Sequence, residues 1–147
     1  MSGRLADLSG PEVTDLLTSD SVVVLPVGAI EQHGPHLPMS VDAVIAEEVA
    51  SALLNAVGDD IDLWLLPTLA VSKSNEHAWS PGTLWLSAET LMRVLDDLAA
   101  CVAATPARRL VLLNGHGGNS SLLVTACRDL RVAHGLLTFL VHPFIPP

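Results

Sequence analysis

The stretch "SVVVLPVGAIEQHGPHLPMSVDAVIAEEVA", residues 21–50, holds an apolar run, a polar loop and a helical pattern in that order. Its first part, residues 21–27, is rich in β-branched side chains and predicts a buried strand. Glycine and proline interrupt the middle, which predicts a loop. Across residues 42–57, apolar residues recur at spacings of three and four, which predicts an amphipathic helix with Asp42 at its start. Strand, loop and helix in this order are the building unit of parallel α/β sheets.

The remaining sequence repeats this alternation. Further strands are predicted at 61–67, 108–114 and 136–142, and further helices at 87–104 and 119–135. Ser87 and Asn119 are the expected helix caps, and Gly135 is the expected stop of the last helix. A capping-box sequence, Ser9 to Glu12, predicts an additional short helix. Strands separated by helices of this length form right-handed parallel units, so we expect one α/β domain spanning 1–147 with a mostly parallel sheet.

Composition excludes several functions. The net charge is −9 and no run of Lys or Arg occurs, so we expect no nucleic-acid partner. The apolar runs are too short to cross a bilayer and the amino terminus has no signal-like segment, which predicts a cytoplasmic protein without a membrane partner. Half of the residues are apolar and the mean hydropathy is +0.47. Because this is rich for a small domain, we expect apolar surface to be covered by another subunit or by further polypeptide.

The two cysteines predict neither a disulfide framework nor a zinc knuckle. Cys101 and Cys127 are the whole cysteine complement and have no C-x-x-C spacing. The expected role of both is that of small core residues.

Three loops that follow predicted strands carry most of the chemically interesting residues: 28–41, 67–86 and 114–118. In a parallel sheet, every loop that follows a strand opens at the same carboxyl edge, where ligands bind. The clusters "EQHGPHLP" and "NGHGGN" are therefore expected to be neighbours in space.

Four residues in or directly after these loops supply a metal-ligand set: Glu31, His33, Asp42 and His116. Two carboxylates and two imidazoles suit zinc, manganese or iron(II), with zinc expected first. Each residue also has an ordinary explanation. Asp42 alone is typical of a helix N-cap, His33 of a hydrogen-bonded loop histidine, and "NGHGGN" of a glycine-rich turn or phosphate cradle. Their joint placement at one sheet edge favours a divalent metal site.

Three segments together resemble the creatininase family of metal-dependent hydrolases: "PVGAIEQHGPHLPMSVD", "SPGTLWLS" and "LVLLNGHGGN". The resemblance extends from about residue 20 to 141. It implies a three-layer α/β/α fold, a dinuclear site for zinc, manganese or iron, and a homo-oligomer that is usually a hexamer. Family members cleave creatinine, formamidopyrimidine intermediates, a mycofactocin precursor peptide or cyclic inosose derivatives, mostly at C–N bonds and with metal-activated water.

Carried over residue by residue, the resemblance implies that Glu31, Asp42 and His116 bind one metal, while His33 and the bridging Asp42 serve the other. The chain departs from creatininase proper at Gly118, where that enzyme has a glutamate for the second metal, which argues against creatinine as the substrate. Other branches take this glutamate from a later "H-A-G-x-x-E" segment. This chain ends at "HPFIPP". We therefore expect the family's C-terminal part, with the second-site glutamate and a catalytic histidine, to be absent.

The loop 67–86 adds four residues that either line a substrate pocket or anchor an interface: Glu76, His77, Trp79 and Trp85. His77 is the candidate catalytic acid, because cleavage of a C–N bond requires protonation of the leaving nitrogen. His36 is expected to orient His33. His134, near a helix end, is expected to interact with the helix dipole.

The sequence thus predicts a metal-dependent amidohydrolase acting on a small cyclic amide, a formamide or a short peptide. The alternatives are a metal- or ligand-binding domain that no longer catalyses, and an oligomerisation partner of a longer relative.

Overall fold

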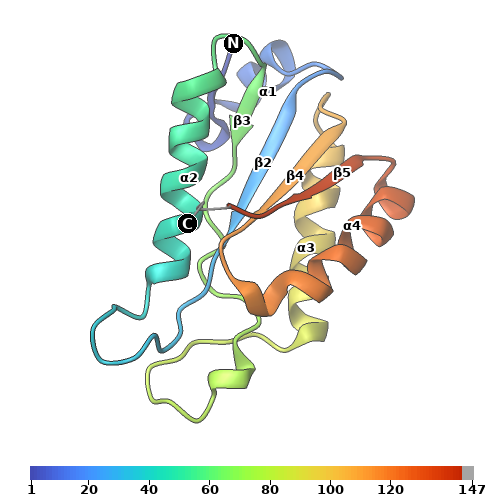
Figure 1. Ribbon diagram of the computed structural model, residues 1–147. Coiled ribbons are helices and arrows are strands. Elements are labelled where there is room, and N and C mark those ends of the chain that lie inside the picture. The colour runs from blue at the N-terminus through green and yellow to red at the C-terminus, as the bar shows by residue number, and fades with distance from the viewer. Residues whose placement is uncertain (144–147) are drawn as a thin grey trace.

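The computed structural model describes residues 1–143, which contain a parallel sheet in the order β1-β3-β2-β4-β5 (Figure 1). The strands are β1 (Gly3–Arg4), β2 (Val22–Val27), β3 (Leu63–Leu65), β4 (Arg109–Asn114) and β5 (Leu137–Val141). The helices are α1 (Gly10–Leu16), α2 (Val41–Val57), α3 (Ala88–Ala103) and α4 (Ser120–His134). Short 3-10 turns occupy Leu5–Asp7, Asn75–His77 and Gly117–Asn119.

Helices cover the sheet on both faces and complete three layers (Figure 1). On one face, α3 and α4 pack on β2 and β4 through a core that includes Leu25, Leu95 and Leu112. On the other face, α2 packs through Ala50 against Leu65 of β3 and its neighbours. The predicted α/β class with a three-layer, mostly parallel arrangement is confirmed.

The central strands are apolar on both faces because both faces are covered. All three residues of β3 and five of the six of β2 are buried. The strand β2 lies between β3 and β4, with Val24 opposite both Leu65 and Val111. This explains why the sequence shows continuous apolar runs here in place of a polar and apolar alternation.

Three predicted helix boundaries are confirmed. The Glu12 carboxylate accepts hydrogen bonds from the Ser9 backbone N–H at 2.8 Å and from its hydroxyl at 2.6 Å. These bonds lower the pKa of Glu12. Ser87 Oγ accepts from the Thr90 N–H at 3.1 Å and so caps α3. Gly135 ends α4 in the left-handed region with φ +65°.

The helix α2 begins at Val41, one residue before its predicted start, so Asp42 lies in its first turn with its carboxylate facing the histidines. Other expectations were wrong in part. Asn119 precedes α4, but its side chain bonds to other loops and does not cap the helix. Cys101 is exposed, whereas Cys127 is buried and its burial raises the pKa of the thiol. The two-residue strand β1 was not predicted, because so short a segment has no periodicity to detect.

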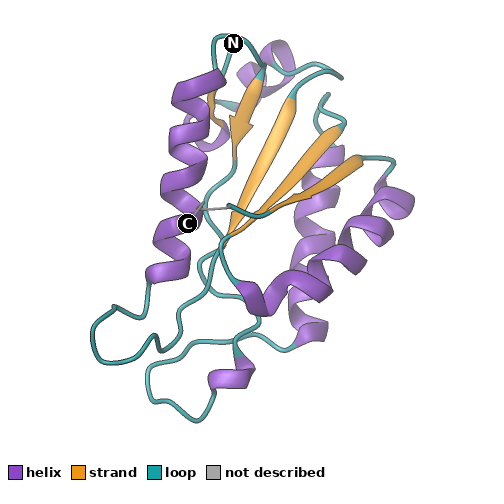
Figure 2. Cartoon of the chain, in the orientation of Figure 1, coloured by secondary structure: helices purple, strands orange, loops and turns teal. Residues whose placement is uncertain are grey.

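The long loops gather at one end of the sheet (Figure 2). This end is the carboxyl edge, where the segments after β2, β3 and β4 leave the sheet. Among the described residues, no helix is long and apolar enough to cross a membrane.

Candidate metal centre

Three buried side chains meet at the carboxyl edge of the sheet. Glu31 follows β2, Asp42 lies in the first turn of α2, and His116 follows β4. Each offers one ligand atom, and these atoms all lie within 4.8 Å of one another. Buried carboxylates and imidazoles are uncommon unless they are paired or hold a metal. The expected meeting of the two sequence clusters is therefore observed.

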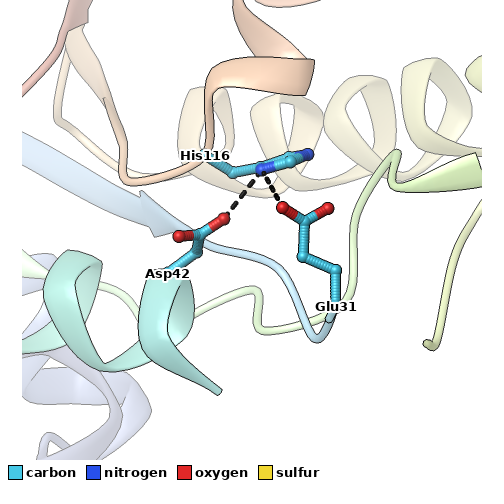
Figure 3. Close-up of side chains that lie close together, drawn as sticks. All are labelled: Glu31, Asp42 and His116. Atoms are coloured by element: carbon cyan, nitrogen blue, oxygen red, sulfur yellow. Dashed lines mark hydrogen bonds and ion pairs between the residues drawn. The ribbon is translucent and has the colours of Figure 1, made fainter. Parts of the chain in front are cut away.

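One ring nitrogen of His116 faces both carboxylates (Figure 3). Its Nδ1 lies 2.8 Å from Asp42 Oδ2 and 3.3 Å from Glu31 Oε1. Burial alone would lower the pKa of His116. The hydrogen bond to Asp42, the two negative charges and the Lys73 carbonyl outweigh burial and raise the pKa.

His33 approaches the same carboxylates from a more open side. Its Nε2 lies 3.1 Å from Asp42 Oδ1 and 3.9 Å from Glu31 Oε1. Its Nδ1 is 3.1 Å from the Glu31 carbonyl, which as an acceptor places the proton on Nδ1. This ring orientation directs Nε2 toward the carboxylates. All four residues expected as ligands are brought together, with Asp42 between the two histidines; their ligation of a metal stays a prediction.

Close packing of two glycines against α2 places Asp42. A Cβ on Gly28, just after β2, would lie well under 3.0 Å from the Ala43 backbone, a separation that real Cβ atoms do not show. A Cβ on Gly115, just after β4, would lie 2.6 Å from the Asp42 carbonyl oxygen. The first turn of α2 therefore sits directly on the ends of two strands. A larger side chain at either glycine would push the carboxylate of Asp42 away from the histidines.

A buried polar network fixes the loops beneath the site. Asn119 Nδ2 donates to Ser72 Oγ at 2.9 Å and to Asn114 Oδ1 at 3.3 Å. Asn119 Oδ1 accepts from the Lys73 N–H at 3.2 Å, and Asn114 Oδ1 accepts from the His116 N–H at 3.2 Å. The two asparagines thus join the loop after β3 to the loop after β4. Sequence reasoning missed this role, although the paired asparagines of "NGHGGN" were the available signal.

One buried oxygen at the site has no hydrogen-bond partner: Glu31 Oε2. An unpaired buried carboxylate oxygen costs free energy, and a second carboxylate, Asp42, is buried beside the same imidazole. A divalent cation would compensate both charges and supply the missing partner for this oxygen. The residues present therefore fit a divalent metal.

His77 lies at the border of this group. Its Nε2 is 4.0 Å from Glu31 Oε2, its Nδ1 is 3.4 Å from Gln32 Nε2, and its ring packs edge-on against Trp79 with centroids 6.3 Å apart. The ring is partly exposed, so it can reach both the acidic cluster and solvent. Its expected role as the acid is compatible with this position and stays a prediction. Trp79 and Trp85 are exposed, and their roles in lining a pocket or anchoring an interface stay predictions.

Glu76, which was expected in a pocket or an interface, lies beside the candidate metal ligand His116. Its Oε1 is 3.6 Å from His116 Nε2, and its Oε2 accepts from Lys73 Nζ at 3.0 Å.

One other histidine expectation was wrong: His36 is exposed, and His33 is oriented by the Glu31 carbonyl instead. His134 lies in the last turn of α4, and its interaction with the helix dipole stays a prediction. Its Nε2 also pairs with Asp96 Oδ1 at 2.6 Å, which links α4 to α3.

Known proteins resemble this chain over most of its length. It matches the family described as "Creatininase: Creatinine amidohydrolase" over residues 6–145. It is 38% identical over 135 residues to the mycofactocin precursor peptide peptidase of Mycobacterium tuberculosis, which covers 86% of this chain and 53% of that protein. It is also 38% identical over 123 residues to the creatinine amidohydrolase of Pseudomonas putida, covering 78% and 46% respectively. The chain thus spans about half the length of the curated relatives it matches.

Solved structures agree with these matches. A tryptophan-to-phenylalanine variant of creatininase superposes with a TM-score of 0.79 at 32% identity, covering 97% of this chain and 58% of that one. Two more creatininase structures, a glutamate-to-glutamine variant of zinc–zinc type and a manganese form, give TM-scores of 0.73 and 0.71 at 34% identity with the same coverage. The match over most of the chain, together with the shared architecture and the acidic and histidine cluster at the sheet edge, leads to one conclusion: the chain belongs to the creatininase family.

Proposed function

We propose that this chain forms the metal-holding part of a hydrolase that cleaves an amide-type C–N bond in a small cyclic amide, a formamide or a short peptide. The observation that carries the proposal is the buried group of Glu31, Asp42 and His116, whose ligand atoms lie within 4.8 Å of one another. The relatives named as a peptide peptidase and a creatinine amidohydrolase support this substrate class. The zinc and manganese creatininase structures support a divalent metal.

The residues divide into three roles. Glu31, Asp42 and His116 would hold one cation, and His33 with the shared Asp42 would serve a second. When bound, the metal supplies an activated water and polarises the substrate carbonyl. His77, at the border of the acidic cluster, would protonate the leaving nitrogen. The buried side chains of Asn114 and Asn119 pack beside His116 and exclude bulk water from one side of the group.

Metal content tests the proposal directly. The purified chain, loaded with zinc or manganese and dialysed without chelator, should retain about one equivalent of tightly bound metal or more. His116→Ala should weaken binding by more than about 100-fold, because it removes a buried ligand, whereas outer residues typically cost 10- to 100-fold. Isothermal titration and elemental analysis measure both quantities.

His134→Ala is the matched control, since His134 pairs with Asp96 away from the site and its loss should leave metal binding unchanged. Less than about a tenth of an equivalent in the wild-type chain would contradict the proposal, as would equal losses in both variants.

A second candidate is a metal-binding domain that does not turn over substrate by itself. Gly118 stands at the position of the second-metal glutamate implied by the creatininase resemblance, and the chain spans about half of its relatives. We expect this chain alone to be weakly active or inactive. A form extended at its C-terminus by a segment supplying a histidine and a glutamate should be active on cyclic amides, formamides or short peptides. Full chelator-sensitive turnover by the short chain would exclude the second candidate.

A further inference from the structure

The Nε2 edge of the His116 ring contacts a second group of residues, Lys73 and Glu76. While Nδ1 faces Glu31 and Asp42, Nε2 lies 3.1 Å from the Lys73 carbonyl oxygen and 3.6 Å from Glu76 Oε1. A carbonyl oxygen only accepts hydrogen bonds, so Nε2 must carry a proton. This proton leaves Nδ1 as the nitrogen whose lone pair can bind a cation.

Glu76 is held in place through one of its oxygens. Oε2 accepts from Lys73 Nζ at 3.0 Å, which leaves Oε1 directed toward the imidazole. The Lys73 backbone is itself fixed, because its N–H donates to the buried Asn119 side chain at 3.2 Å. A surface ion pair three residues apart contributes little to stability. The contact with a buried histidine distinguishes this pair from an ordinary one.

The space for Glu76 exists because residue 118 is a glycine. A Cβ at Gly118 would lie well under 3.0 Å from both Glu76 Oε1 and His116 Nε2, closer than real Cβ atoms approach. A Cβ at the neighbouring Gly117 would meet nothing within 4 Å. The second of these two glycines therefore makes room for the carboxylate behind His116, and the first does not.

We infer that Glu76 is a positioning residue, which together with the Lys73 carbonyl orients His116 and fixes its proton on Nε2, so that Nδ1 binds the metal. Carboxylates behind metal-bound histidines fix the tautomer and raise the basicity of the ligand nitrogen. The assignment rests on the proposed metal site. Direct ligation by Glu76 is less consistent with the distances, because Glu76 lies at the Nε2 edge and the two buried carboxylates lie at the Nδ1 edge of the same ring.

The test compares zinc affinity and histidine tautomer in five proteins. In the zinc-loaded wild type, the ¹⁵N chemical shifts of the His116 ring should report protonated Nε2 and metal-bound Nδ1. Glu76→Ala should weaken zinc binding about 10- to 100-fold without changing the number of zinc ions bound. Glu76→Gln keeps an oxygen acceptor and should restore part of this loss. Gly118→Ala should weaken zinc binding at least as much as Glu76→Ala, because its Cβ would displace both Glu76 and the His116 ring, and Gly117→Ala should match the wild type.

Each other outcome overturns the assignment. Unchanged zinc affinity and unchanged ¹⁵N shifts in Glu76→Ala would show that the carboxylate does nothing for His116. Loss of one zinc equivalent, with the affinity of the remaining zinc unchanged, would make Glu76 a direct ligand. Equal weakening by both alanine-for-glycine variants would mean that the loop simply tolerates no side chain. Failure of the wild type to bind zinc would contradict the proposed metal site itself, and is thereby distinguished from failure of the inference.

Discussion

At the scale of single residues, the candidate site is costly to the protein unless it binds a cation. Glu31 and Asp42 are both buried, and Glu31 Oε2 lacks a hydrogen-bond partner. Within residues 1–143, the groups nearest to these charges are the imidazoles of His33 and His116, and His77 Nε2 lies farther away, at 4.0 Å from Glu31 Oε2. Functional sites often hold such unfavourable arrangements, because the charges that bind a ligand repel one another in its absence. Stability and metal binding are therefore expected to respond in opposite directions to removal of one charge.

Glu31→Gln tests this expectation. Removing one of two adjacent buried charges should leave the melting temperature of the metal-free protein unchanged or higher. The same change should abolish stabilisation by metal, which for a free concentration 100 times the dissociation constant is about 2.7 kcal/mol. For a domain of this size that corresponds to a shift of about 5–11 °C. Thermal unfolding with and without zinc measures both effects.

The exposed Glu48→Gln on α2 is the control and should behave like the wild type in both conditions. A large destabilisation of the metal-free Glu31→Gln protein would instead show that Glu31 is needed for folding itself.

At the scale of elements, patterns that depend on neighbouring residues were predictable and patterns that depend on distant ones were not. The capping box at Ser9, the cap at Ser87 and the stop at Gly135 are local, and the structure confirms them. Asn119 was expected to cap α4 for the same local reason. Its side chain instead bonds to residues more than forty positions away, which a helix-start rule cannot detect.

The candidate site divides in the same way. Parallel topology was enough to predict that Glu31, Asp42 and His116 would be neighbours, because each belongs to a loop or helix start at one sheet edge. The place of Glu76 behind His116 depends on how the loop after β3 folds back, and the open space beside Gly118 appears only in three dimensions. Neither feature has a signature in the sequence.

Gly28 provides the test at this scale. Gly28→Ala would place a methyl group against the Ala43 backbone, so the first turn of α2 must move. Overpacking of this kind typically costs about 1–3 kcal/mol. Because Asp42 directly precedes Ala43 in that turn, we also expect weaker zinc binding. Denaturant unfolding and zinc titration measure the two effects.

Gly10→Ala is a suitable control, since a Cβ there meets nothing within 4 Å. It should leave both quantities close to those of the wild type. Normal zinc affinity in a destabilised Gly28→Ala protein would show that α2 adjusts without moving Asp42.

At the scale of the whole molecule, the two faces of the sheet are covered unequally. The helices α3 and α4 lie on one face, whereas α2 packs over β2 and β3 on the other (Figure 1). Along β5, Thr138 is buried while Leu137, Phe139 and Val141 are exposed. Strand residues alternate between faces, and the buried Thr138 faces α4. The three exposed side chains therefore form an apolar row on the opposite face, the one that carries α2, at the β5 edge of the sheet.

This apolar row predicts association. Burying apolar surface contributes about 25 cal/mol per Å², so a second copy or further polypeptide would gain free energy by covering it. We expect the chain at micromolar concentration to form an oligomer or to aggregate, and Phe139→Lys to shift it toward the monomer. Val132→Lys changes an apolar residue of α4 that is 86% exposed and should leave association unchanged. Sedimentation velocity compares the three proteins; a clean wild-type monomer, or an equal response to both lysines, would contradict a role for this face.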